Sequence, residues 1–293
     1  MSEINCFYVS SHGILKSCSL AITTFKEPNM IFNIERLKKG DVLYLDATLV
    51  LPFYKKYWKH IKEPIKIVSG NQDITFPEIE TEDPDIFNRF LSEPKLIKWF
   101  SQNMCLSGPK VEKIPIGLDY HTLANHMGTG HPWGKGIMPI VQEAYLRGVE
   151  RKPWAERLPV AFCNWHFFAD RGDRKEVLEK ADKRCFYFVQ NYQVRVESWA
   201  AQGHFAFVCS PRGGGIDCHR TWEALCLGCV PIVKTSGMDS LWDGLPVWIV
   251  NDWSEITPEN CQKQKELFAG KQELFNSHKL RLGYWTNDVI LAK

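Results

Sequence analysis

The stretch from Phe205 to Val233 constrains the fold of this chain most strongly, and it reads FAFVCSPRGGGIDCHRTWEALCLGCVPIV. The apolar run Phe205 to Cys209 is rich in aromatic and β-branched residues and ends at a proline, as a buried strand of a parallel sheet does. A glycine turn follows, then a predicted helix from Cys218 to Leu227 and a second strand from Val230 to Val233. Such a unit is typical of an open α/β fold, in which ligands bind at the carboxyl ends of the strands.

The turn between this strand and helix has the composition of a phosphate-binding loop. Its three consecutive glycines permit positive φ and let the backbone approach a ligand closely. The helix N-terminus carries a partial positive charge, basic residues surround it, and Glu223 follows one turn later, where it can bind ribose hydroxyls. The sequence therefore predicts a nucleoside diphosphate site. Its predicted donor-binding residues in this stretch are Ser210, Arg212, Gly213, Gly214, Asp217 as the N-cap, His219, Arg220 and Glu223.

Two other interpretations of this loop stay open. Glycine-rich turns between a strand and a helix are common in α/β proteins whatever they bind. Arg220 and Glu223 are three residues apart on a helix, so they can simply form an intrahelical ion pair.

The order of residues in this stretch resembles the C-terminal signature of exostosin-like glycosyltransferases. That signature is a Pro-Arg-Gly loop followed by an arginine, an aromatic residue, Glu-Ala and a Gly-Cys-(Ile/Val)-Pro strand start. The matching residues are Pro211-Arg212-Gly213, Arg220, Trp222, Glu223-Ala224 and Gly228-Cys229-Val230-Pro231. The chain looks more like the compact, soluble members found in large DNA viruses of algae and in bacteria than like the longer, membrane-anchored animal exostosins. The resemblance implies an inverting transfer of a sugar from a UDP-sugar.

Composition and cysteine usage favour a soluble protein of a reducing compartment. The chain has 293 residues, 44% hydrophobic and 24% charged, with a net charge of only +2. No basic stripe indicates nucleic acid, and no stretch of about 18 apolar residues indicates membrane insertion. The N-terminus lacks the pattern of a signal peptide, and the ten cysteines are scattered through apolar segments. We therefore expect a soluble, cytoplasmic protein, in the host cytoplasm if it is viral.

Strand-like and helix-like segments alternate in two successive series. The first series has expected strands at Ile4–Val9, Val42–Asp46, Ile65–Val68 and Lys113–Ile116, with helices at Ile14–Phe25, Asn33–Lys39, Leu49–Ile61 and Pro94–Asn103. The second has strands at Val160–Asn164, Cys185–Val189, Phe205–Cys209, Val230–Val233 and Val247–Ile249, with helices at Lys175–Ala181, Tyr192–Gln202 and Cys218–Leu227. This alternation predicts α/β domains with parallel sheets.

Two series of similar size predict two Rossmann-like domains facing a cleft, the glycosyltransferase architecture called GT-B. We place an acceptor-side domain at residues 1–150 and a nucleotide-sugar-binding domain at 151–271. A helix at about 272–293 is expected to cross back to the first domain, with Tyr284 and Trp285 as its docking residues.

The remaining site residues are predicted from the ends of other strands. In the second domain, Asn164 ends a strand, and Arg171 and Arg174 follow it as further donor-binding candidates. The catalytic base should come from the first domain, where Asp73 follows a strand and a glycine turn, so it is our first choice. Weaker acceptor-side candidates are His12, Asp46, Asn71, Asp119 and His121. Asp and His often simply cap such turns, and this alternative stays open for each.

No metal site is expected from the sequence. The triplet Asp83-Pro84-Asp85 lies in an acidic turn with no apolar strand before it, unlike a manganese-binding Asp-x-Asp motif. His121, His126 and His131 recur every five residues, which does not place them on one helix face. Cys226 and Cys229 form a C-x-x-C without a second ligand pair, so they are expected in the core.

The sequence thus predicts an inverting, metal-independent glycosyltransferase that moves a sugar from a UDP-sugar to a hydroxyl of an oligosaccharide or glycoprotein glycan. Xylose is the first choice for the sugar. Trp133 and Trp165, in the expected cleft loops, can stack on sugar rings. The alternative is a nucleotide- or glycan-binding protein that has this fold without catalysis.

Overall fold

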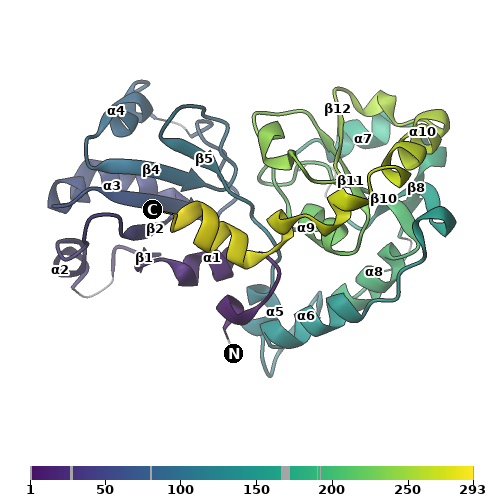
Figure 1. Cartoon of the computed structure of the whole chain (residues 1–293), viewed down its shortest axis with the longest axis horizontal. Helices are drawn as coiled ribbons and strands as arrows, with labels where there is room; N and C mark the ends of the chain where they lie inside the picture. The colour runs from purple at the N-terminus through teal and green to yellow at the C-terminus, as the bar shows by residue number, and fades with distance from the viewer. Residues whose placement is uncertain are drawn as a thin grey trace.

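The computed structural model describes residues 2–26, 29–79, 81–165, 172–189, 191 and 193–292. The chain forms two lobes, each built on a five-stranded sheet (Figure 1). Every strand pair within these two sheets is parallel. The predicted fold class, two α/β domains with parallel sheets, is therefore confirmed. A small hairpin, β6 (Gly130–His131) and β7 (Gly134–Lys135), lies between them in the chain.

In the first sheet the strands lie side by side in the order of the sequence. They are β1 (Leu20–Ile22), β2 (Val42–Asp46), β3 (Ile65–Gly70), β4 (Leu96–Ser101) and β5 (Val111–Lys113). The helices between them, α2 (Met30–Ile34), α3 (Val50–Tyr57) and α4 (Ile86–Ser92), share one hydrophobic cluster with one face of the sheet. Val42, Tyr44, Val68 and Phe100 belong to a different cluster, which also contains Ile14 of α1 (Ser11–Ser17). The sheet is thus buried on both faces.

The C-terminal segment covers this second face. After α10 (Pro258–Ala269), two short 3-10 turns and a π-helix (Tyr284–Ile290) cross to the first lobe, where the segment lies beside α1 (Figure 1). The backbone of Leu280 accepts from Val9 N at 2.9 Å, and Leu282 N donates to Phe7 O at 2.9 Å. Trp285 is buried in the same cluster as Tyr44. The expected single helix over 272–293 is wrong, because the segment is broken into short pieces.

The second sheet has a different strand order, β12-β11-β10-β8-β9. Its strands are β8 (Leu158–Cys163), β9 (Phe186–Phe188), β10 (Phe205–Cys209), β11 (Val230–Lys234) and β12 (Trp248–Val250). The helices α7 (Arg174–Lys180), α8 (Arg195–Gln202) and α9 (His219–Cys226) connect them. Strand order reverses between β8 and β10, and the crevice at such a switch point is where open α/β sheets bind ligands.

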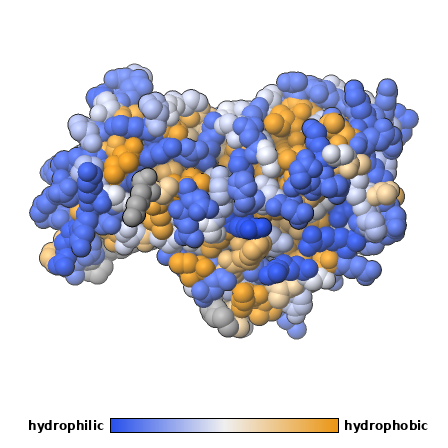
Figure 2. Space-filling view, viewed as in Figure 1, coloured by the Kyte–Doolittle hydropathy of each residue, from blue (hydrophilic) through white to orange (hydrophobic). Residues whose placement is uncertain are grey.

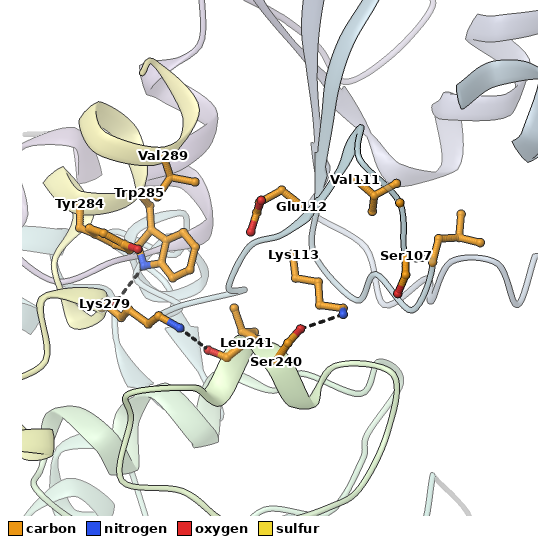
Figure 3. A pocket seen from close by; sticks show the side chains of 12 residues that line it. Ser107, Val111, Glu112, Lys113, Ser240, Leu241, Lys279, Tyr284, Trp285 and Val289 are labelled. Atoms are coloured by element: carbon orange, nitrogen blue, oxygen red, sulfur yellow. Dashed lines mark hydrogen bonds between the residues drawn. The ribbon is translucent and has the colours of Figure 1, made fainter. Parts of the chain in front are cut away.

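The two lobes also meet behind β5, around a cavity of about 200 Å³ (Figure 3). Lys113 of the first lobe donates to Ser240 Oγ of the second at 2.9 Å. Ser240 belongs to a 3-10 turn, Asp239–Trp242, whose next residue, Leu241, accepts at its backbone oxygen from Lys279 at 3.1 Å. Trp285 Nε1 in turn donates to Lys279 O at 2.7 Å (Figure 3). The C-terminal segment therefore contacts both lobes.

Three predictions in the first series are wrong. Ile4–Val9 is not a strand: Glu3–Asn5 forms a 3-10 turn, and Tyr8 and Ser10 make only isolated bridges. The expected helix Ile14–Phe25 is instead α1 followed by β1. The expected helix Pro94–Asn103 is the buried strand β4. The strands expected at Val42–Asp46 and Phe205–Cys209 are confirmed residue for residue.

Short helices and a mostly polar surface complete the molecule. In chain order, α5 (His121–Ala124) and α6 (Pro139–Gly148) come between the two sheets, and in Figure 1 they lie below the two lobes. On the face shown in Figure 2, hydrophilic residues cover most of both lobes, and apolar residues gather lower down, around these two helices. Within the described residues, none of the helices is both long and apolar enough to span a bilayer.

The cover on the first sheet makes Trp285 important for stability. We expect Trp285→Ala to lower the unfolding free energy by about 3–5 kcal/mol, because it opens a cavity under the sheet. Leu291→Ala, in the same segment but 44% exposed, should change it by no more than about 0.5 kcal/mol. Urea unfolding of the two variants measures both values. Equal effects would mean that the segment does not stabilise the first domain.

Candidate active site

A cavity of about 520 Å³ lies between the lobes, at the carboxyl ends of β8 and β10. It therefore lies at the switch point of the second sheet. Asp73 and Ile116 line it from the first lobe, and Trp133 lines it from the connecting segment. Of the predicted donor-binding residues, those that line this cavity are Asn164, Arg174, Gly213, Gly214, Asp217, His219, Arg220 and Glu223. The structure thus brings most of the predicted site together, with the predicted base facing it.

The glycines of the loop are explained first by contact between the lobes. A Cβ on Gly214 would collide with the carboxyl group of Asp73, and one on Gly215 would lie 2.5 Å from Asn103 Nδ2. Gly213 has room for a Cβ, since its nearest neighbours would be at 3.5 Å. None of the three has positive φ. The sequence prediction of positive φ in this loop is therefore wrong. Gly214 and Gly215 are needed because the first lobe approaches the loop closely.

Three basic side chains surround the loop and the start of α9. Arg174 is buried, with Nη2 beside Gly213. Arg220 Nη1 donates to Ser210 Oγ at 3.3 Å and to Pro211 O at 3.2 Å. His219 Nδ1 lies 2.7 Å from Gly117 O, and because a carbonyl only accepts, Nδ1 carries the proton and Nε2 is left for a ligand. These groups form a positively charged wall at the phosphate end of the cavity.

Ser210 supports this wall without lining the cavity. Its side chain is buried, and its Oγ lies 2.8 Å from Thr221 Oγ1 as well as near Arg220. The hydroxyl therefore holds Arg220 in place. As a direct ligand of the donor, Ser210 does not fit this geometry.

Arg212 lies outside the cavity, unlike the sequence prediction. Its Nη2 forms an ion pair with Glu78 Oε2 at 2.5 Å, across to the first lobe. Both side chains are partly exposed, at 37% and 50%. The loop arginine therefore links the lobes in this structure and would have to leave Glu78 to reach a diphosphate.

Asp217 is also used between the lobes and does not cap α9. The N-cap of α9 is Cys218, which makes no side-chain capping bond. Asp217 Oδ2 accepts from Ile116 N at 2.7 Å, and its own N–H donates to Asn103 Oδ1 at 2.7 Å. Trp222 Nε1 donates to the same carboxylate. Burial raises the pKa of Asp217 to about 6. Asp217 therefore bridges the two lobes at the edge of the cavity. Its predicted role as N-cap is wrong, and its role as a donor ligand stays a prediction.

The sequence analysis missed Arg195, which lies at the centre of the site. Its Nη2 pairs with Asp119 Oδ2 at 3.0 Å, and its Nε lies 3.7 Å from Glu223 Oε1. The guanidinium carbon also lies 4.6 Å from the ring centroid of Trp133. Burial raises the pKa of Glu223, and Arg195 opposes that effect. Arg195 thus lies beside two buried carboxylates at the cavity, and no spacing in the sequence pointed to it.

The aromatic residues of the cavity differ in part from those expected. Trp133 and Trp165 both line it, where the sequence placed them. Trp199, for which the sequence predicted no site role, lines it as well. Asn164 Nδ2 donates to Ser198 Oγ at 2.8 Å, which leaves its buried Oδ1 toward the same cavity without a hydrogen-bond partner in the described part of the chain. Arg171 lies outside the described residues.

The predicted acceptor-side residues form one cluster next to the cavity and do not line it. The rings of His12 and His121 stack with centroids 3.9 Å apart. His12 Nε2 lies 3.0 Å from Asn71 Oδ1, and Asn71 Nδ2 donates to Asp46 Oδ2 at 3.3 Å. Asp46 also accepts from Thr48 N, so capping explains its position. The cluster is therefore a network built around His12 and His121.

Two groups in this cluster have strongly shifted pKa values. Burial opposes ionisation of Asp119, but His219, Arg195 and His121 together hold its pKa well below the usual range. Burial lowers the pKa of His121 to about 4, although Asp119 acts in the opposite direction. Asp119 is thus a fixed anion paired with Arg195, which makes it a poor proton acceptor.

The other motifs examined for metal binding make ordinary contacts. Asp83 forms an ion pair with Arg89, at the start of α4. His126 and His131 have ring centroids 4.7 Å apart, and His131 packs against Trp133. Cys226 and Cys229 are buried in the core. The core position of the two cysteines is the one expected from the sequence.

Comparisons with known proteins give only distant likenesses. No family model matches the sequence, and no curated protein matches it. A structure described as trehalose-6-phosphate from E. coli bound with UDP-2-fluoro glucose is 13% identical, with a TM-score of 0.45, over 90% of this chain and 76% of that chain. A UDP-forming α,α-trehalose-phosphate synthase from Burkholderia xenovorans with glucose-6-phosphate is also 13% identical, with a TM-score of 0.42, over 89% and 75%. These values are too low to assign a function.

The ion pair between Arg212 and Glu78 makes a testable prediction about the donor site. If Arg212 moves to a bound diphosphate, Glu78 competes with that ligand, so Glu78→Gln should tighten UDP binding. An exposed ion pair is worth up to about 1 kcal/mol, which corresponds to about fivefold in Kd. Calorimetric titration with UDP measures the change. Glu82→Gln, an exposed acid of the same segment, should leave the affinity within twofold of the native chain. An unchanged Kd in Glu78→Gln would place Arg212 outside the donor site.

Proposed function

We propose that this protein is a glycosyltransferase that moves a sugar from a UDP-sugar to a hydroxyl of a glycan. One observation carries the proposal: a single cavity between two α/β domains is lined by the arginines Arg174 and Arg220 from one domain and by a carboxylate, Asp73, from the other. Glycosyl transfer needs both groups, because the leaving diphosphate must be stabilised and the acceptor hydroxyl must lose a proton.

The residues of the second domain suit the nucleoside diphosphate. Arg174 and Arg220 can bind the phosphate oxygens, His219 can do so when its Nε2 is also protonated, and the N-terminus of α9 adds its partial positive charge. Glu223, held by Arg195, suits the ribose hydroxyls. We propose that these cations are sufficient for the diphosphate, so that donor binding needs no metal ion. The UDP nucleotide itself rests on the resemblance in sequence.

Asp73 must move before it can act as the base. Its carboxyl group packs against Gly214, where it would repel a diphosphate bound to the same loop. Donor binding should therefore separate the two lobes slightly and bring the freed Asp73 toward the acceptor hydroxyl. Direct attack by that hydroxyl at the anomeric carbon forms the new glycosidic bond and breaks the bond to the diphosphate, with inversion. Xylose remains the first choice of sugar.

The donor site can be tested by UDP binding. We expect Glu223→Gln to weaken UDP binding by roughly tenfold. A hydrogen bond to a charged group contributes about 1.5–3 kcal/mol, and the neutral glutamine oxygen keeps only part of that free energy. Glu176→Gln is the matched control: Glu176 lies on α7 and pairs with Lys180 and Lys234 outside the cavity. Isothermal titration in a chelating buffer measures both. Equal loss in the two variants, or UDP binding only after Mn²⁺ is added, would contradict the proposed donor site.

The base can be tested separately from the donor. Asp73→Asn should lower the rate of transfer by about 10²–10⁴, as expected of a general base, without weakening UDP binding, because it removes a negative charge from the phosphate loop. Asp83→Asn, which changes an exposed acid near the same segment, should transfer at the native rate. The configuration of the product is the second measurement. A retained anomeric configuration, or near-native transfer by Asp73→Asn, would remove Asp73 as the base; binding of UDP with no transfer to any acceptor would favour a binding protein.

A further inference from the structure

The cluster beside the cavity contains a buried carboxylate, Glu3, with one oxygen that has no hydrogen-bond partner among the described residues. Glu3 is 1% exposed, and this oxygen is its Oε2. Two imidazoles face its other oxygen: His12 Nδ1 and His121 Nδ1 each lie 4.0 Å from Glu3 Oε1. A carboxylate in this position is costly unless a cation binds beside it.

We propose that Glu3, His12 and His121 bind one first-row transition metal dication, for which Zn²⁺ is the best match. Their three donor atoms lie within 4.8 Å of one another. Two imidazole nitrogens and one carboxylate oxygen form the donor set of many zinc sites, whereas Ca²⁺ and Mg²⁺ prefer oxygen ligands. Both histidines are partly exposed, at 21% and 22%, so an ion can enter from solvent.

The groups behind the two histidines set up the ligand atoms. Asn71 Nδ2 donates to Asp46, so its Oδ1 is the atom that accepts from His12 Nε2. The proton of His12 is therefore on Nε2, and the lone pair of Nδ1 faces Glu3. Metal-binding histidines commonly have such a partner on the second nitrogen. His121 Nδ1 lies 3.2 Å from Asp119 Oδ1, so the proton of the neutral ring must move to Nε2 before Nδ1 can bind a metal.

A modest rearrangement completes the site. Ligand atoms around tetrahedral zinc lie about 3.4 Å apart, so each histidine nitrogen must approach Glu3 by about 0.6 Å. The rings stack with an interplanar angle of 18°, and they must tilt so that their lone pairs converge. The torsion that turns a histidine ring is broad and soft, which permits this tilt.

This site could not be found from spacing in the sequence. Glu3 comes from the first 3-10 turn, His12 from α1 and His121 from α5. The metal would tie these three segments together. It departs from the expectation that the chain holds no metal, but it does not involve the diphosphate, since none of the three residues lines the cavity. Its failure would therefore leave the proposed donor site unchanged.

Zinc binding to the full chain tests the proposal. Competition with a chromogenic chelator should give one Zn²⁺ ion per chain. Glu3→Gln, His12→Gln and His121→Gln should each weaken binding at least tenfold. Zinc should also raise the unfolding midpoint of the native chain and not that of these variants. Unfolding midpoints measured in the presence of a chelator identify any variant that fails to fold. If Glu3→Gln fails to fold, the variants of the two partly exposed histidines still test the proposal.

Two controls separate this site from other metal ligands of the chain. His126→Gln and His131→Gln remove a neighbouring histidine pair and should bind zinc as the native chain does. The ten cysteines could also bind metal, so the Co²⁺-loaded protein should show no thiolate-to-metal charge-transfer band. The proposal is overturned if no ion binds, if that band appears at one equivalent of Co²⁺, or if all three site variants keep native affinity.

Discussion

Both faces of a parallel sheet must be covered, and in the first domain this requirement decides where the end of the chain lies. The strands β1 to β5 follow the order of the sequence, and the helices between them cover one face only. The opposite face is covered by α1 and by the C-terminal segment through Leu280, Leu282 and Trp285. Because that segment also bonds to Leu241 of the second domain, it sets how the two domains sit relative to each other. The cavity between them depends on this arrangement.

The contact between the domains and the proposed donor site use the same loop. Asp73 and Asn103 approach Gly214 and Gly215 closely, and Asp217 bonds to Ile116 across the hinge. A glycine-rich loop is therefore required here even without a ligand. The same close approach brings a first-domain carboxylate to the phosphate end of the cavity. Closure of the empty protein and binding of an anionic donor thus compete for one surface, which couples donor binding to movement of the domains.

The sequence predicted the second domain better than the first for a physical reason. Strands β10 and β11 are continuous apolar runs bounded by glycine and proline, so their type and limits are readable. Strand β4 is also buried on both faces, with Trp99 in one hydrophobic cluster and Phe100 in the other. Its apolar residues fit a buried helix equally well, and periodicity alone does not separate the two. The extended segment before Ser10 was taken for a strand, but it bonds to Glu143 and to the C-terminal segment instead.

The candidate site shows a similar limit. The sequence identified polar residues at strand ends, but it could not tell a ligand-facing side chain from one that faces the other domain. Arg212 and Asp217 have the right residue types and positions, and both are used between the lobes. Arg195 was missed because a lone arginine at a helix start carries no pattern. The partners of these residues come from segments far away in sequence, so only the folded chain reveals them.

Arg195 shows how the charges of the two halves depend on each other. It binds Asp119, next to α5, and Glu223, on α9, while Trp133 stacks on its guanidinium. Removing it would leave two buried carboxylates without their cation, which costs far more than the net value of an intact buried pair. Arg195 therefore opposes the rise that burial causes in the pKa of Glu223. A ribose that binds Glu223 meets a carboxylate already held in place, and so loses little free energy to reorganisation of the site.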